Sequence, residues 1–404
     1  MKVVVIPSRI AGKITAPPSK SKAHRLLICA GLADGESIVR GVSPSEDVLA
    51  TVDCLSTLGA SCDYDGKDVR VSGISPEKMT PHGTLECREC GSTLRFFIPI
   101  CLTTGKKTML SGSEKLLSRP LSVYEELCRA RGFEFSNDGK KVTVSGKLES
   151  GEYTVRGDVS SQFVSGLLFA LPTLRGDSRI TLTGAVESRP YIDMTIAALE
   201  KFGVCAEWTG DNTIFVKGGQ KFAPACVTVE GDWSNAAFFE ALNLIGGDVS
   251  VDGLDFSSAQ GDKICVEYFE KLAAGAPTLS LTDCPDLGPV MFAMAAEKNG
   301  ATFTGTRRLR IKESDRVASM AAELYKFGAE FEIGDDTVTV KKRALHAPTD
   351  ILSSHNDHRV AMALSVLMTK YGGAILGAEA VKKSMPDFYE KLSSLGAEVI
   401  YEDK

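Results

Sequence analysis

The chain has 404 residues, of which 43% are hydrophobic and 24% charged, and this length and composition are typical of a globular protein with about two domains. A formal net charge of -6 argues against a general nucleic-acid-binding surface, and no stretch approaches the roughly 20 apolar residues of a membrane span. The apolar run in MKVVVIPSRI is too short for a secretory signal, and the eleven cysteines are scattered and odd in number. We therefore expect a cytoplasmic protein with reduced thiols.

A recurring pattern of a helix, a glycine and then alternating β-type residues divides the chain. Glycine tolerates the left-handed conformation that ends many helices, and β-branched or aromatic residues follow it. Successive glycines are 73, 71, 72, 53 and 68 residues apart, at Gly59, Gly132, Gly203, Gly275, Gly328 and Gly396. A period of about 70 exceeds that of common solenoids, so the pattern predicts six α/β units in two globular domains of three units each.

The first motif, APPSKSKAHRLLICAGL, predicts a helix that begins near Ser21. Lys20, Ser21 and Arg25 then lie at or within its first turns, where backbone N–H groups and the positive end of the helix dipole favour an anion. An ordinary N-cap is the alternative explanation. We favour an anion site because cations at a helix N-terminus oppose the dipole unless an anion lies between them.

Two further helix starts have similar chemistry. In ECGSTLRFFIPI, Gly91 permits close approach of the backbone and Arg95 lies in the first turn. In GDVSSQFVSGLL, the residues Ser160, Ser161 and Gln162 precede an apolar helix and offer uncharged donors for phosphate oxygens. A Ser-Ser pair is usually just a cap, but one such start occurs in each of the first three units.

The next motif, VESRPYIDMT, places Ser188, Arg189 and Tyr191 around Pro190. The residue before a proline avoids the helical region of backbone space, so we expect this segment to be extended. A tyrosine here is more often a packing residue than a ligand contact. The motif therefore adds candidates to the anion-binding group without defining a site by itself.

Charged residues gather at helix starts in the second half of the chain. LTDCPDLGPVMF places Asp286 either as an N-cap or as an acid facing the space between the domains, and NDHRVAM opens a helix with a charged run. KKSMPDF places Lys383 before a helix started by proline. TRRLRIKESDR is the densest cationic stretch, although Glu and Lys at such spacing also decorate exposed helix faces.

Two short motifs contain possible metal ligands. CREC provides Cys87 and Cys90, and His355 and His358 are three residues apart. A zinc site would need further ligands at a familiar spacing, and a thioredoxin-type motif would need its own βαβ context. We therefore expect neither a metal nor a redox cofactor.

Together these motifs resemble the 5-enolpyruvylshikimate-3-phosphate (EPSP) synthase family of enolpyruvyl transferases over essentially the whole chain. The similarity rests on order and approximate spacing of PPSKSKAHR, GSTLRF, SRPL, VSSQF, SRPYIDMT, DCPDLGPV, KESDR, NDHRVAM and KKSMPDF. It implies a two-domain inside-out α/β barrel in which each domain has three βαβαββ repeats and the active site lies in the cleft between domains. It also implies an N-terminal domain of residues 15–228, mainly for shikimate 3-phosphate, and a C-terminal domain of residues 1–14 and 229–404, with much of the phosphoenolpyruvate side.

The resemblance implies a reaction without cofactors. The carboxyvinyl group of phosphoenolpyruvate passes to the 5-hydroxyl of shikimate 3-phosphate through a tetrahedral ketal, and phosphate is released, in aromatic amino-acid biosynthesis. The implied partners are these two small molecules, with no nucleic acid or membrane, and the implied state is a monomer. Each substrate carries a phosphate and a carboxylate, which would explain why an acidic chain concentrates cations at a few helix starts.

The resemblance also implies a role for each matching residue. The implied shikimate 3-phosphate contacts are Ser21, Arg25, Ser160, Ser161, Gln162, Ser188, Tyr191 and Lys312. The implied phosphoenolpyruvate contacts are Lys20, Gly91, Lys115, Gln162, Arg316, Arg359 and Lys383. The implied catalytic residues are Asp286 as the base on the 5-hydroxyl, with Glu313 and Lys20 as candidate proton donors to the methylene carbon.

Three positions depart from the commoner pattern of the family. Glu89 replaces an asparagine near phosphoenolpyruvate, Lys115 replaces an arginine, and Arg308 replaces an asparagine on the shikimate side. Lysine keeps the charge of arginine but loses its bidentate geometry. We expect Glu89 to turn away from the anionic substrate or to pair with a cation such as Lys115.

Two other functions are open to the same chain. A sister enolpyruvyl transferase acts on UDP-N-acetylglucosamine, but that family typically has a reactive cysteine on a mobile loop, and the corresponding GSEKLLSRP has none. The chain could also be a non-catalytic paralogue that only binds a phosphorylated metabolite. The joint presence of Lys20, Asp286 and Glu313 argues against that alternative, because binding alone needs neither a base nor an acid.

Overall fold

The computed structural model describes residues 1–402 and divides the chain into two compact units. The N-terminal unit is Pro18–Glu230, and the C-terminal unit combines Met1–Pro17 with Gly231–Lys404. The chain therefore crosses between the units twice. The structure divides the chain after Pro17 and after Glu230. The limits expected from the sequence, after residues 14 and 228, lie three and two residues earlier.

The N-terminal unit contains three repeats with one order of elements. The first has α1 (Lys20–Leu32), β3 (Gly35–Arg40), α2 (Glu46–Thr57), β4 (Ser61–Tyr64), β5 (Val69–Gly73) and the short helix η1 (Pro76–Lys78), and is joined by β14 (Cys226–Thr228). The second has β6 (Leu85–Glu86), α3 (Gly91–Thr103), β7 (Thr108–Ser111), α4 (Glu114–Leu117), α5 (Ser122–Ala130), β8 (Glu134–Asn137) and β9 (Lys141–Ser145). The third has β10 (Glu152–Arg156), α6 (Ser161–Ala170), η2 (Leu171–Thr173), β11 (Ser178–Thr183), α7 (Arg189–Glu200), β12 (Ala206–Trp208) and β13 (Thr213–Val216).

Each of these repeats forms one four-stranded sheet with the same strand order. The orders are β14-β3-β5-β4, β6-β7-β9-β8 and β10-β11-β13-β12. In each sheet the first two strands are parallel, as where Tyr153 of β10 lies opposite Ile180 of β11, and the other pairs are antiparallel. A crossover helix joins parallel strands and a tight hairpin joins antiparallel ones, which gives the βαβαββ repeat.

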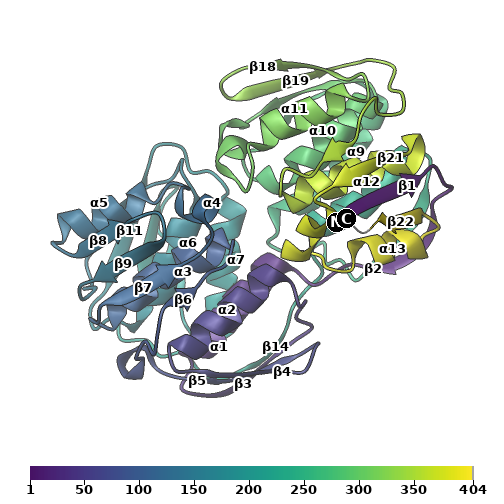
Figure 1. Cartoon of the computed structure of the whole chain (residues 1–404). Helices are drawn as coiled ribbons and strands as arrows, with labels where there is room; N and C mark the ends of the chain where they lie inside the picture. Colours follow the sequence, from purple (N-terminus) through teal and green to yellow (C-terminus); the bar gives the residue numbers. More distant parts are fainter. Residues whose placement is uncertain (403–404) are drawn as a thin grey trace. The chain divides into compact units, whose positions relative to one another are not determined.

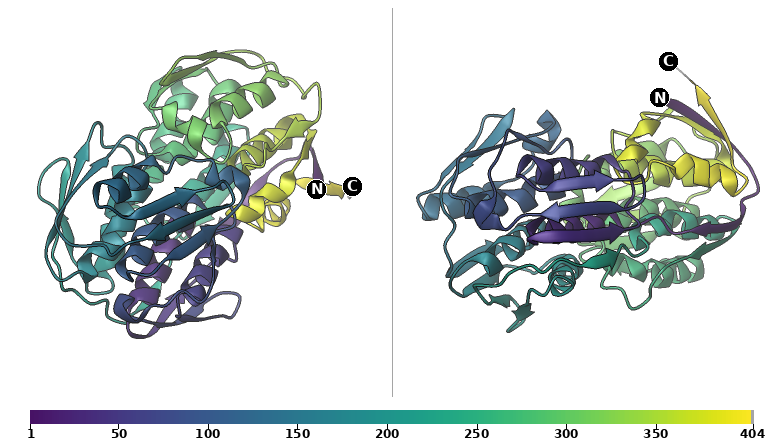
Figure 2. Two further views of the ribbon diagram at one scale, coloured as in Figure 1. Left: turned by 60° about the vertical axis from the view of Figure 1, so that its left-hand side comes forward. Right: turned by 90° about the horizontal axis from the view of Figure 1, so that it is seen from below.

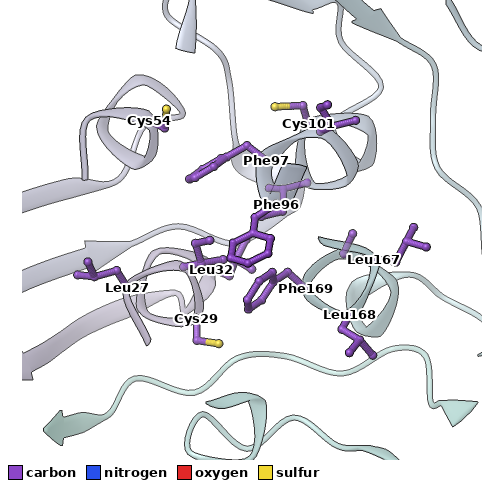
Figure 3. Close-up of a cluster of buried hydrophobic side chains, with 14 of the residues drawn as sticks. Leu27, Cys29, Leu32, Cys54, Phe96, Phe97, Cys101, Leu167, Leu168 and Phe169 are labelled. Atoms are coloured by element: carbon purple, nitrogen blue, oxygen red, sulfur yellow. The ribbon is translucent and has the colours of Figure 1, made fainter. Parts of the chain in front are cut away.

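The first long helix of each repeat forms the core of this unit. α1, α3 and α6 are buried along nearly their whole length. α3 and α6 are largely apolar, as expected of buried helices, whereas α1 also buries Lys22, His24 and Arg25. Figure 3 shows Phe96 of α3 and Phe169 of α6 meeting next to Leu32 of α1, and the two rings make an edge-on contact with centroids 5.4 Å apart. The strands alternate between buried and exposed residues, so the sheets cover the helices and turn one face outward. In Figure 1, β3, β4, β5 and β14 lie along α1 and α2.

The C-terminal unit contains the other three repeats. The fourth has β2 (Ala11–Thr15), α8 (Trp233–Leu244), β15 (Asp248–Asp252), η3 (Gly261–Ile264) and α9 (Cys265–Ala274). The fifth has β16 (Thr278–Ser280), η4 (Pro285–Leu287), α10 (Gly288–Glu297), β17 (Ala301–Thr304), η5 (Arg307–Ile311), α11 (Arg316–Tyr325), β18 (Glu330–Ile333) and β19 (Thr337–Lys341). The sixth has β20 (Leu352–Ser353), α12 (His358–Tyr371), β21 (Gly373–Leu376), η6 (Ala378–Lys383), α13 (Phe388–Ser394), β22 (Glu398–Glu402) and β1 (Lys2–Ile6).

The N-terminal residues complete two sheets of this unit. β1 lies between β21 and β22 in the order β20-β21-β1-β22, and β2 pairs in parallel with β15. Both views of Figure 2 therefore show the purple first strand close to the yellow last strand. Residues Met1–Pro17 thus belong with the second half of the chain, which the periodicity could not show.

The fourth repeat departs from the predicted pattern. Its sheet has only β2 and β15, because the chain passes from α9 through Gly275 directly into β16, the first strand of the next sheet. The final hairpin of the βαβαββ repeat, which the family resemblance implies here, is missing after Gly275. Its absence explains why the interval from Gly275 to Gly328 is 53 residues when the others are 68 to 73. The α/β class and the repeated βαβ order are confirmed.

The C-terminal unit has the same kind of core. α8, α10 and α12 are buried along most of their lengths, while α9 and α11 bury one face only. All eleven cysteines are free thiols. Within residues 1–402, we find no helix with both the length and the apolar character that a membrane crossing requires.

Candidate active site

In the N-terminal unit, the starts of α3 and α6 are joined by a chain of polar contacts. Arg95 Nη1 donates to Gln162 Oε1 at 2.8 Å, and Gln162 Nε2 donates to Ser92 Oγ at 2.9 Å. Arg95 also donates to the Pro120 carbonyl at 3.1 Å. The amide of Gln162 is thereby fixed in one orientation between two helices, which the sequence could not show.

The three helix starts that the sequence predicts are present. α1 begins at Lys20 after the cap Ser19, α3 begins at Gly91, and α6 begins at Ser161 after the cap Ser160. The Ser160 hydroxyl oxygen accepts from the Gln162 backbone N–H at 3.3 Å, so Ser160 is indeed an N-cap. Capping uses only the acceptor side of the hydroxyl, and its O–H can still donate to an anion.

Ser188 and Arg189 do not form the extended segment that the sequence predicts. Ser188 has φ 55° and ψ 40°, in the left-handed region, and α7 begins at once with Arg189. The prediction is wrong because Pro190 occupies the first turn of α7, where a fixed φ and a missing N–H fit a helix well. Ser188 is buried, and a non-glycine residue held in this region is a feature often found at functional sites.

Arg25 is the most enclosed cation of this unit. Its guanidinium donates to Thr195 Oγ1 at 2.8 Å and to the carbonyls of Ser21 (2.7 Å) and Tyr191 (2.9 Å), and it lies 5.2 Å from the Phe96 ring centroid. Burial lowers the pKa of Arg25 to about 10, which leaves it protonated at neutral pH. These contacts fix α1 against α7 and hold the guanidinium in one place.

Lys20 has a buried carboxylate as its partner. Lys20 Nζ lies 2.8 Å from Asp47 Oδ2, and the side chains are only 12% and 10% exposed. Asp47 belongs to the first turn of α2, so the pair crosses from one helix start to the next. The cation that opposes the dipole of α1 is thus compensated by a negative charge of the protein itself.

Gly91 lies where two guanidinium groups approach the helix start. A Cβ atom at this position would lie 2.8 Å from Arg119 Nη1 and 2.8 Å from Arg95 Nη1, closer than side chains normally come. Arg119 belongs to the SRPL motif. The need for glycine here is therefore steric, and the start of α3 carries two cations beside its free backbone N–H groups.

Lys115 and Glu89 do not pair with each other. Lys115 is exposed on the short helix α4, and within residues 1–402 its side chain forms no ion pair. The pairing of Glu89 with Lys115 that the sequence suggests is therefore not formed.

In the C-terminal unit, Asp286 is the centre of a charged group. It lies in η4 before α10, and the helix cap is Leu287, so Asp286 is not the N-cap. Its Oδ1 lies 2.9 Å from Arg316 Nη1 and 3.5 Å from Lys312 Nζ, while Oδ2 lies 2.9 Å from Arg359 Nη2. The Asp286 side chain is 17% exposed and therefore reachable by a small ligand.

Arg316 connects three carboxylates and is itself 1% exposed. Besides Asp286, its Nη2 lies 2.7 Å from Glu313 Oε2 and its Nε lies 2.9 Å from Asp357 Oδ2. Burial opposes the charge of the Arg316 guanidinium, but Asp357, Glu313 and Asp286 outweigh it and raise its pKa above the ordinary value. The Glu313 and Asp286 carboxylates are thus held on one planar group.

Lys312 differs from the neighbouring arginines because its pKa is lowered, so it loses its proton more easily. Burial, with the positive charges of Arg316 and Arg308, lowers the pKa of Lys312 to about 8 against the attraction of Asp286. Arg308 is buried close by, in η5. An added anion at this place would be favoured, because it would offset the excess of cations.

The last two predicted cations lie on the sixth repeat. Arg359 is in the first turn of α12, contacts Asp286, and reaches the Ser234 carbonyl of α8 at 3.5 Å. Lys383, at the end of η6, donates from Nζ to the Asn356 carbonyl at 2.5 Å. The group in this unit therefore combines the starts of α8, α10, α11 and α12.

One group of possible metal ligands occurs among residues 1–402: His24, Asp47 and Cys90, all buried. His24 Nε2 lies 3.7 Å from Cys90 Sγ, but Asp47 is already paired with Lys20. Of the sequence candidates, only Cys90 takes part. The Cys87 thiol donates to the Leu85 carbonyl, and His355 donates to Glu323 at 2.8 Å, so His355 and His358 form no ligand pair.

Sequence reasoning did not assign roles to several residues of these groups. Asp47 looks like an ordinary acidic residue in the first turn of α2, and Asp357 looks like an ordinary N-cap. Arg119 lies inside a quoted motif but was given no role. Two features of the sequence could have identified Arg119. One is the Arg-Pro pair in SRPL, and the other is Gly91, whose missing side chain leaves room for the Arg119 guanidinium.

The comparisons with known proteins agree with one another. The family model for EPSP synthase (3-phosphoshikimate 1-carboxyvinyltransferase) matches residues 4–277 and 275–392. A 3-phosphoshikimate 1-carboxyvinyltransferase of Clostridium kluyveri is 39% identical over 422 aligned positions, covering 99% of this chain and 98% of the relative, and one of Clostridium perfringens is 36% identical with 98% of each covered. Among solved structures, EPSP synthase of Acinetobacter baumannii matches with a TM-score of 0.79 at 23% identity, covering 99% of this chain and all of that one. The enolpyruvyl transferase NikO of Streptomyces tendae matches with a TM-score of 0.79 at 13% identity, covering 99% and 98%.

Proposed function

The chain belongs to the EPSP synthase family, and on this premise we propose that it transfers the carboxyvinyl group of phosphoenolpyruvate to the 5-hydroxyl of shikimate 3-phosphate and releases phosphate. The observation that carries the proposal is the group around Asp286, in which one partly exposed carboxylate contacts Arg316, Arg359 and Lys312. Such a group offers a base next to fixed cations, which is what a reaction between an alcohol and an anionic enol phosphate needs.

The cations are proposed to hold phosphoenolpyruvate. Arg359 and Lys383 of the C-terminal unit would bind its phosphate and carboxylate, with Arg316 and Lys20 contributing positive charge. Gly91 lets the guanidinium groups of Arg119 and Arg95 come close to the start of α3, and Arg95 orients Gln162 beside it. Lys115 remains a weaker candidate, because it lies exposed on α4.

Shikimate 3-phosphate is proposed to bind through hydroxyl and N–H donors. Ser160, Ser161 and Ser188 would hold its phosphate, since uncharged donors at a helix N-terminus suit phosphate oxygens. Arg25, fixed by three internal hydrogen bonds, would meet the carboxylate. The remaining proposed contacts are Ser21, Gln162, Tyr191 and Lys312.

The chemistry is proposed to use two carboxylates on one guanidinium. The oxygen of the 5-hydroxyl bonds to C2 of phosphoenolpyruvate while Asp286 takes the proton of this hydroxyl. Glu313 or Lys20 gives a proton to the methylene carbon. In the resulting ketal, the group that protonated the methylene carbon takes a proton back from the methyl group as the C–O bond to phosphate breaks, which restores the carbon–carbon double bond. Arg316 contacts both carboxylates, at 2.9 Å and 2.7 Å, and this supports their acting on neighbouring atoms.

A phosphate-release assay with the purified protein tests this function. We expect phosphate from phosphoenolpyruvate when shikimate 3-phosphate is present, and none when UDP-N-acetylglucosamine replaces it. Turnover with the sugar nucleotide would assign the chain to the sister activity. Tight binding of shikimate 3-phosphate without phosphate release would instead identify a binding protein.

The pKa of Lys312 predicts how substrate affinity depends on pH. If its ammonium binds shikimate 3-phosphate, the KM for that substrate should rise above pH 8 by up to about tenfold per pH unit, because only the protonated form attracts the anion. Arginine stays protonated throughout this range, so Lys312→Arg should abolish the rise. Identical profiles for the wild type and the variant, measured from pH 6.5 to 9.5, would remove Lys312 from the site.

We also propose that the protein acts as a monomer in the cytoplasm and needs no cofactor. Free thiols, and the lack of a membrane-crossing helix in residues 1–402, fit this setting. Light scattering would give the mass in solution. An assay after dialysis against a chelator would test the independence from metals, and loss of activity that zinc restores would contradict it.

A further inference from the structure

A strained turn precedes the cationic helix start of the sixth repeat. His355 and Asn356 have φ of 50° and 55°, and they are two of only four non-glycine residues with positive φ within residues 1–402. Asparagine and histidine enter this left-handed region more often than most residues, but a non-glycine residue there still costs of order 1–3 kcal/mol. Two adjacent residues of this kind persist only where surrounding contacts hold them.

The turn carries the residues proposed to bind phosphoenolpyruvate. It leads directly into Asp357, which is fully buried and contacts Arg316, and then into Arg359, which contacts Asp286. The Asn356 carbonyl accepts from Lys383 Nζ at 2.5 Å. Three proposed ligand cations, Arg316, Arg359 and Lys383, thus depend on the course of this one turn.

Glu323 holds the turn from the neighbouring helix. It lies on α11, is 3% exposed, and contacts none of the proposed substrate residues. Its Oε2 accepts from the Ser353 backbone N–H at 3.0 Å and from Lys326 Nζ at 2.8 Å. Its Oε1 faces His355 Nε2 at 2.8 Å, and since a carboxylate only accepts, Nε2 carries the proton and donates it.

The spacing of Arg316 and Glu323 along α11 shows how this helix contacts the turn. Arg316, at the start of the helix, contacts Asp357 just after the turn, and Glu323, seven residues later, contacts Ser353 and His355 within it. Residues seven apart lie on one face of a helix, two turns from each other. The same face of α11 therefore fixes both ends of the turn.

We infer that Glu323 and His355 are positioning residues for phosphoenolpyruvate, acting through the turn that carries Asp357 and Arg359. This inference rests on the proposed function. The contact between them keeps His355 in its strained conformation, and through it keeps Arg359 and the Asn356 carbonyl in register with Arg316 and Lys383. Neither residue touches the ligand.

Replacing His355 by Asn and by Gln separates this role from a purely structural one. Asparagine tolerates the left-handed backbone but is too short to reach Glu323, whereas glutamine can place an N–H close to the position of histidine Nε2. We expect His355→Asn to raise the KM for phosphoenolpyruvate about tenfold, because the variant loses part of the free energy of one hydrogen bond to a charged group. The KM for shikimate 3-phosphate should stay within about twofold of the wild-type value. His355→Gln should restore phosphoenolpyruvate binding to within about threefold of the wild type.

The exposed His346 of the same unit provides the matched control, and His346→Asn should behave as the wild type. An unchanged KM for phosphoenolpyruvate in His355→Asn overturns the inference. So does an equal loss for both substrates together with a lower unfolding midpoint, or a failure of His355→Gln to restore binding while it remains folded. A wild type that releases no phosphate refutes the proposed function, and this inference with it, before any variant is compared.

Discussion

Replacing Asp286 by Asn is expected to lower kcat by about 10²–10⁴-fold, the range typical of a lost general base. Asparagine keeps the shape of the side chain and removes its charge, so it cannot accept the proton of the 5-hydroxyl. The KM for phosphoenolpyruvate should not rise, because Arg316, Arg359 and Lys312 lose a competing anion. Steady-state kinetics with each substrate varied, and equilibrium binding of shikimate 3-phosphate, measure the two effects separately.

Asp283 gives the control for this experiment. It lies three residues earlier, outside the charged group and exposed, so Asp283→Asn should retain the kinetics of the wild type. If Asp286→Asn keeps its turnover within tenfold and only changes a KM, Asp286 is not the base. Glu313 would then be the next carboxylate to test.

Replacing Arg316 by Met is expected to destabilise the C-terminal unit by about 3–5 kcal/mol. The substitution leaves Asp357, which is fully buried, without its guanidinium partner, and also removes a partner from Glu313 and Asp286. Removing one member of a buried ion pair costs the desolvation of the charge left behind. Urea unfolding followed by tryptophan fluorescence measures the loss.

The two tryptophans allow each unit to be followed by itself. Trp233 is buried in the C-terminal unit and Trp208 belongs to the N-terminal unit, so a Trp208→Phe background reports on the C-terminal unit alone. Arg307→Met is the control, because Arg307 and Asp335 form an exposed pair 2.8 Å apart, worth less than about 1 kcal/mol. A loss no larger in Arg316→Met than in the control would mean that the buried network does not hold this unit together.

Local chemistry explains what the sequence could predict. The starts of α1, α6 and α12 follow from Ser or Asp cap residues placed before apolar runs, and caps act within three residues of themselves. The repeat follows from glycines at helix ends, and all of them except Gly275 adopt the positive φ that glycine tolerates. Both signals are short in range, so a single sequence contains them.

The contacts that organise the two charged groups are long in range. Lys20 meets Asp47 across 27 residues, and Arg359 meets Asp286 across 73. No local pattern distinguishes Asp47 from other acidic residues near a helix start, so pairing becomes visible only after the helices have packed. The same reason hides the contact between Glu323 and His355.

One local prediction failed, and one feature implied by the family resemblance is missing in one repeat. The extended conformation expected before Pro190 gave way to a helix start, since proline fits the first turn of a helix as well as it fits a strand. The hairpin missing after Gly275 was implied by the family's βαβαββ repeat, not by the residues that follow this glycine. The residues after Gly275 do form a strand, but it opens the next sheet.

The central proposal is that phosphoenolpyruvate and shikimate 3-phosphate bind to the cations and helix starts described in each unit. A crystal structure with shikimate 3-phosphate and an unreactive analogue of phosphoenolpyruvate tests it most directly. We predict Lys20 and Arg25, together with Lys312 and Arg359, at hydrogen-bond distance, about 2.7–3.2 Å, from ligand phosphate or carboxylate oxygens. Ligands bound elsewhere, with these four side chains directed into solvent, would contradict the account.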